Sequence, residues 1–105
     1  MTPSFDLANK VILDIKNGSF NGEMLPFLRY ERELLDEASK IARENPNDAI
    51  DYLADGITAL NSMIFSIRED RYGVEKNMSF QLELIEAALL KIYEHFLNLL
   101  KEIES

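Results

Sequence analysis

Apolar residues recur at alternating steps of four and three along the last 28 residues of the chain. This spacing places them on one side of an α-helix of about seven turns, over residues 78–104. The stripe consists of Met78, Leu82, Ile85, Leu89, Ile92, Phe96, Leu99 and Ile103. Four more apolar residues widen it along one flank: Leu90, Tyr93, Leu97 and Leu100. The helix therefore has more apolar surface than a coiled-coil seam, which needs only two apolar positions in each heptad. We expect a neighbouring element to cover the excess.

Three further helices are predicted by shorter apolar stripes at helical spacing. We expect them at 4–16, 24–44 and 48–70. The residues that mark their ends are Thr2 or Ser4, Asn17-Gly18, Asn45-Pro46, Asn47 as an N-cap, and Gly73. Four helices with short connections predict an all-α, antiparallel, up-down-up-down four-helix bundle whose first helix is short and loosely attached. A chain of this length has one core, so we expect a single domain over 1–105.

Some positions carry specific expectations about packing. We expect Leu28 to face inward from the second helix, and Ile50 and Ile57 to face inward from the third. Gly56, in the middle of the third helix, costs about 1 kcal/mol relative to alanine. It therefore indicates either a close approach between helices or a tolerated defect. Phe20, in the first loop, is expected to pack on the core as a lid, or else to be a contact residue on a flexible loop.

Charge narrows the class of partner. The chain has 19 acidic and 11 basic residues, and its net charge of −8 repels a phosphate backbone. We therefore expect no direct binding to nucleic acid, whereas an acidic surface favours basic protein surfaces. The sequence has no cysteine, no leader-like start and no apolar run that would span a membrane. We expect an unprocessed cytoplasmic protein that does not bind membranes.

Residues suited to catalysis are few. His95 is the only histidine; we expect it at the half-buried edge of the last helix, where it cannot form a two-histidine metal site. Asp48, Asp51 and Asp55 share the side of the third helix opposite its apolar stripe. We interpret them as a solvated face, with a cation site or a contact to a basic surface as alternatives. No glycine-rich phosphate loop or nucleophile motif is present. We therefore expect no enzyme activity, no metal and no cofactor.

The acidic residues leave one enzyme activity as an alternative. A metal-dependent all-α hydrolase would draw carboxylates from neighbouring helices at helical spacing. The residues available for it are Asp51, Asp55, Glu33 and Asp36.

The surplus apolar flank indicates that the protein acts by binding a protein through helix packing. The expected interface residues are Leu90, Tyr93, Leu97 and Leu100, with Glu94 beside them. Glu86 and Lys101 are expected to complete a polar rim, with Tyr93 as the anchor. Arg68 and Arg71, beside Tyr72 at the turn before the last helix, are candidates to stack on or pair with an anionic partner. The occupant is a second copy, forming a homodimer, or a different protein.

The stretch 57–96 contains Ile-Thr-Ala-Leu-Asn at 57–61, a glycine-bearing turn and a tyrosine-containing helix. It is similar to flagellar export chaperones of the four-helix class, over less than half of the chain and mainly in its helical periodicity. The resemblance implies a protein that clasps an amphipathic helix of its client. The alternative is an acidic inhibitor or immunity-type protein of a mobile element that masks a basic surface, in a complex weakened by salt.

Overall fold

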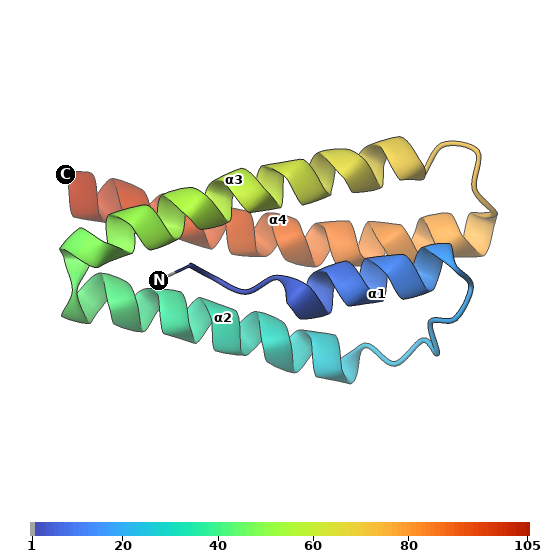
Figure 1. The fold of residues 1–105 in the computed structure, drawn as a ribbon, viewed down its shortest axis with the longest axis horizontal. Helices are drawn as coiled ribbons and strands as arrows, with labels where there is room; N and C mark the ends of the chain where they lie inside the picture. Colours follow the sequence, from blue (N-terminus) through green and yellow to red (C-terminus); the bar gives the residue numbers. More distant parts are fainter. Residues whose placement is uncertain (1) are drawn as a thin grey trace.

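The computed structural model describes residues 2–105 and contains four α-helices (Figure 1). They are α1 (Asp6–Lys16), α2 (Leu25–Glu44), α3 (Pro46–Asp70) and α4 (Lys76–Glu104). Consecutive helices run in opposite directions, so α2 and α4 run parallel to each other. The predicted antiparallel four-helix bundle is confirmed, and residues 2–105 contain no strand.

The last helix is the centre of the bundle and contacts each of the other three. Its 29 residues extend about 44 Å at 1.5 Å per residue, which matches the 44 Å length of the molecule. The residues of its predicted stripe that are fully buried are Leu82, Ile85, Leu89, Ile92 and Phe96. Met78, Leu99 and Ile103 pack against this core and remain half-buried. The stripe read from the sequence is therefore the side of α4 that faces the core.

The first helix covers only part of the gap between α2 and α3. It has 11 residues against 20 in α2, and the extended segment before it runs between those two helices in Figure 1. Pro3 lies beside Gly56 of α3, and the Tyr30 hydroxyl of α2 donates a 2.8 Å hydrogen bond to the Ser4 carbonyl oxygen. These contacts hold the segment in an extended form. The predicted helix start at residue 4, with a side-chain cap, is therefore wrong: α1 begins at Asp6 without one.

The connections between the helices lie where the sequence places glycine, asparagine and proline. Gly18 and Gly73 adopt φ of +76° and +79°, a conformation that other residues rarely adopt. Phe20, between α1 and α2, packs against the core as predicted. Asn45 ends α2 and also precedes the first residue of α3, Pro46. The predicted cap at residue 47 is therefore wrong, because proline already fits the first helical turn.

The buried side of α3 is rotated slightly from its predicted stripe. Ala49 and Gly56 are buried, whereas Ile50 and Ile57 are half-buried. Small residues let neighbouring elements approach closely, so the contact is centred on them. The two isoleucines lie at its border.

Candidate protein-binding surface

The flank predicted as an interface lies on the side of α4 that faces α3. Glu86 is one turn before Leu90 on this flank, and it pairs with Arg68 of α3. The apolar residues of the flank, Leu90, Tyr93, Leu97 and Leu100, are all half-buried, and Glu94 is exposed. All four except Leu97 are packed against the core. Packing within the bundle therefore covers part of the apolar excess, and a narrower strip around Leu97 remains.

Glu86 is buried at 9% exposure and is not part of a rim. Its Oε2 accepts a hydrogen bond from Arg68 Nε at 3.2 Å, and its Oε1 accepts one from Arg71 Nη1 at 3.0 Å. A buried carboxylate requires such partners. The expected rim role of Glu86 is therefore wrong. The two arginines, candidates for pairing with an anionic partner, are both paired within the chain, and pairing with a partner stays a prediction.

A different side of α4, facing α2, exposes more apolar surface. Leu28 was expected in the core, but the adjacent Phe27 takes the inward position and Leu28 points outward. On α4, Phe80 and Leu84 are about one turn apart and therefore share a side. The large apolar residues exposed here, at 40–59% of their surface, are Leu25, Leu28, Phe80 and Leu84. We call these four, together with the half-buried Leu35 and Ala88, the α2–α4 face.

Leu28 and Leu84 lie at the same level of the two parallel helices. The register follows from Ser39 of α2, whose Oγ lies 2.8 Å from Nε2 of His95 on α4. Because the two helices run parallel, the same number of residues toward the N-terminus from Ser39 and from His95 brings position 28 level with position 84. A hollow of about 380 Å³ between α2 and α4, lined in part by Leu28, continues the face toward the middle of the bundle. The face is thus one surface shared by two helices.

Charges of both signs border this face. The buried carboxylate of Glu31 lies 3.3 Å from Lys91 Nζ and joins α2 to α4. Arg32 and Asp36 line the same hollow. An apolar centre with a polar border is the usual anatomy of a protein interface.

His95 is half-buried at the edge of α4, as predicted. Its hydrogen-bond partner Ser39 comes from another helix, so the neighbours of the histidine in sequence gave no sign of it. A serine nucleophile would also need donors aimed at a developing oxyanion. Ser39 lies inside α2, where backbone amides are already used in helical hydrogen bonds. The pair is therefore best interpreted as a hydrogen bond that holds α2 and α4 together.

The acidic residues considered for a hydrolase do not form a metal centre. Asp51 and Asp55 on α3, and Glu33 and Asp36 on α2, are all exposed. Within residues 2–105, no group of three or more Asp, Glu, His or Cys side chains is placed to hold a metal ion. The hydrolase alternative gains no support from this arrangement.

No family model, curated protein or solved structure matches this chain. Along the described part of the chain, none of the helices has the length and apolar character needed to cross a membrane. The interpretation of the surface therefore depends on its own geometry.

Proposed function

We propose that the protein functions by binding an amphipathic helix on the α2–α4 face. The observation that carries this proposal is the pair Leu28 and Leu84, half exposed at one level of two parallel helices. Two such helices form a groove in which a third can pack its apolar ridge. Completing the burial of each leucine contributes about 1 kcal/mol. Stable binding therefore requires that several such residues take part.

The flank of α4 that faces α3 is the second candidate surface for the same function. It rests on Leu97, which is half-buried and is not packed against the core. Its neighbours Leu90, Tyr93 and Leu100 already contact the core and offer less free surface to a partner. The α2–α4 face is therefore the better-supported site.

The occupant is an amphipathic helix that belongs to a client protein or to a second copy of this chain. The border of the face carries both signs of charge, in Glu31, Arg32, Asp36 and Lys91. This mixture fits the polar sides of an amphipathic helix. The uniformly basic surface that the inhibitor alternative requires would meet Arg32 and Lys91 unfavourably.

Aspartate substitutions at Leu28 and Leu84 test the proposal. Both side chains are substantially exposed, so the variants should keep the helical circular-dichroism signal of the parent. The matched control is Leu13→Asp, because Leu13 is 56% exposed on α1, outside the face. Self-association is followed by sedimentation equilibrium, and client binding by fluorescence anisotropy of a synthetic amphipathic peptide of leucine, lysine and glutamate.

Loss of association in Leu28→Asp and Leu84→Asp, with Leu13→Asp unchanged, supports the proposal. The first method then identifies a dimer and the second a client-binding protein. If the parent binds neither itself nor the peptide, or if the three variants behave alike, the α2–α4 face is not a binding site.

A further inference from the structure

The α2–α4 face has its most exposed apolar side chains at one end and its recesses at the other. Leu25 on α2 and Phe80 on α4 lie toward the N-terminal ends of the two helices, with 59% and 58% of their surfaces exposed. Toward the C-terminal ends lie the small, half-buried Ala88 and the hollow of about 380 Å³ between α2 and α4. Leu28 and Leu84 lie between the two ends and therefore mark the middle of the face.

On α4, this arrangement is complementary to itself. When two identical helices pack antiparallel about a two-fold axis, positions at equal distances on either side of the axis face each other. Phe80 lies four residues before Leu84, and Ala88 lies four residues after it. Two copies of α4 centred on Leu84 therefore place the bulky ring of each copy against the small side chain of the other, as in knobs-into-holes packing.

The hollow receives Leu25 in the same arrangement. Leu25 lies three residues before Leu28, and Glu31, which lines the hollow, lies three residues after it. Leu25 of each copy therefore faces the hollow of the other, where Leu28 and Leu35 supply apolar wall. A parallel arrangement would place Leu25 at the level of Phe80 of the second copy. The recesses of the two copies would then face each other and remain unfilled.

The charges at the border favour the antiparallel arrangement as well. Arg32 and Glu23 are both exposed, and neither forms an ion pair with another described residue. Arg32 lies four residues after Leu28, so it comes to the level of position 24 of the second copy, next to Glu23. The two-fold symmetry gives two such pairs of opposite charge.

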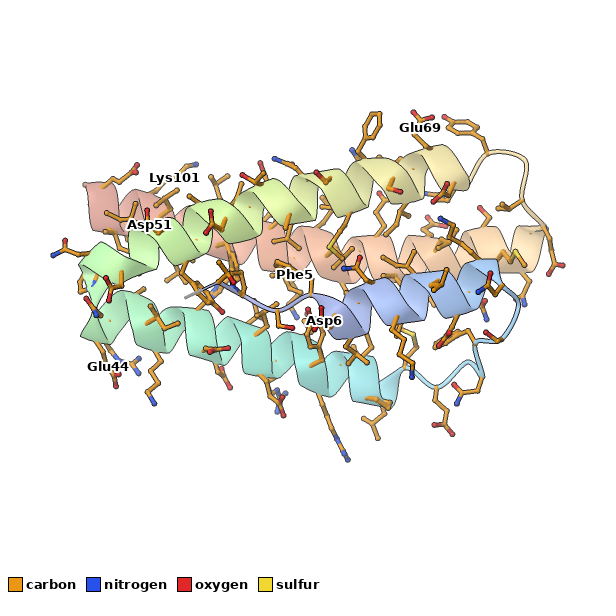
Figure 2. All side chains as sticks on the ribbon, in the orientation of Figure 1. Phe5, Asp6, Glu44, Asp51, Glu69 and Lys101 are labelled. Atoms are coloured by element: carbon orange, nitrogen blue, oxygen red, sulfur yellow. The ribbon has the colours of Figure 1, made fainter. Side chains whose placement is uncertain are left out.

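The first helix leaves the α2–α4 face open. Figure 2 shows Phe5 and Asp6, at the start of α1, between α2 and α3. All the residues that line the hollow belong to α2 and α4. A second copy can therefore reach the face without displacing α1.

We propose that the occupant of the α2–α4 face is a second copy of this chain. The two copies form a two-fold symmetric dimer in which α4 packs antiparallel on α4 at Leu84, and α2 packs antiparallel on α2 at Leu28. This inference rests on the proposed function, because it names the partner of the same face. The two α2 helices face each other over only about two turns. We therefore expect a small interface and a dissociation constant of about 10 µM.

Cysteine crosslinking tests the arrangement, because the chain has no cysteine of its own. Leu84→Cys should form a disulfide with itself under mild oxidation, since the axis passes between its two copies. Phe80→Cys and Ala88→Cys should each remain unlinked alone and should link when the two variants are mixed. Leu13→Cys is the matched control and should not link, because Leu13 is exposed on α1, outside the face.

Sedimentation equilibrium of charge-reversal variants gives an independent readout. Arg32→Glu should weaken the dimer about fivefold, because it replaces two attractive pairs with repulsive ones. The double variant Arg32→Glu/Glu23→Arg should restore the affinity. Lys40→Glu is the matched control, since it changes the net charge equally at an exposed position of α2 outside the face. Equal weakening by Arg32→Glu and Lys40→Glu would overturn the arrangement, because it would indicate general repulsion between acidic chains.

The outcomes separate this inference from the proposed function. A parent chain that is monomeric at about 100 µM and binds the amphipathic peptide overturns the dimer and leaves the proposed function in place. A dimer in which Leu28→Cys links to Leu84→Cys, and Leu84→Cys does not link to itself, is parallel and also overturns the inference. If the parent binds neither itself nor the peptide, both proposals fail.

Discussion

Gly56 of α3 lies directly against the ring of Phe96 on α4. A Cβ atom placed on Gly56 would fall 2.7 Å from Cδ2 of that ring, well inside van der Waals contact. Phe96 is fully buried, at 0% exposure, so the ring has no open space into which it can turn. The glycine at mid-helix is therefore explained by a close helix approach, which was one of the two interpretations open from sequence.

Gly56→Ala should destabilise the protein by about 1–3 kcal/mol, because overpacking outweighs the gain in helix propensity. Urea unfolding followed by circular dichroism measures the difference. Ser62→Ala, at an exposed position of the same helix, is the control and should be neutral or slightly stabilising. Equal stability of Gly56→Ala and the parent would mean that the two helices are farther apart than described.

Glu86→Gln should cost about 1–2 kcal/mol, because it removes the charge that two arginines share. The loss is moderate since Arg68 and Arg71 keep 57% and 31% of their side chains in contact with solvent. Glu83→Gln is the matched control, with a 61% exposed carboxylate 3.7 Å from Arg71, and should change stability by less than about 0.5 kcal/mol. Chemical denaturation of both variants decides the matter; equal effects would contradict a special role for Glu86.

Stability should fall as the pH rises above about 10, the ordinary pKa of tyrosine. Burial raises the pKa of Tyr30 and Tyr52 in the folded state, so the unfolded chain loses these protons first. The stabilisation is therefore fully present below pH 10 and is lost progressively above it. Thermal unfolding across this range should show the decline, and the double variant Tyr30→Phe/Tyr52→Phe should show a shallower one. An identical slope in the variant would contradict the assignment.

Much of the bundle could be predicted from local signals. Asn17-Gly18, Asn45-Pro46 and Gly73 each mark a real connection, because they report backbone geometry that depends on few neighbours. The periodicity of α4 is also a local signal, and it identified the side of the helix that faces the core. The predicted helix start at position 4 is wrong because the Tyr30 hydroxyl binds the Ser4 carbonyl, a contact between residues far apart in sequence.

The surface was harder to predict than the core. The burial of Glu86 and the pairing of Ser39 with His95 depend on which helices are neighbours, and periodicity does not specify that. The sequence does contain one signal of the exposed surface: Phe80, Leu84 and Ala87 lie at steps of four and three on the side of α4 away from its buried stripe. That second stripe indicates exposed apolar surface on α4 outside the core.

Site-specific photo-crosslinking tests the central claim, that the α2–α4 face binds protein, most directly. A benzophenone side chain is placed at position 84, at position 97 on the flank facing α3, and at position 13 as the control, in cells that produce the protein. The account predicts a covalent adduct at 84 with little at 97 and none at 13, its mass showing whether the partner is a second copy. An adduct at 97 or 13 without one at 84 would contradict the claim.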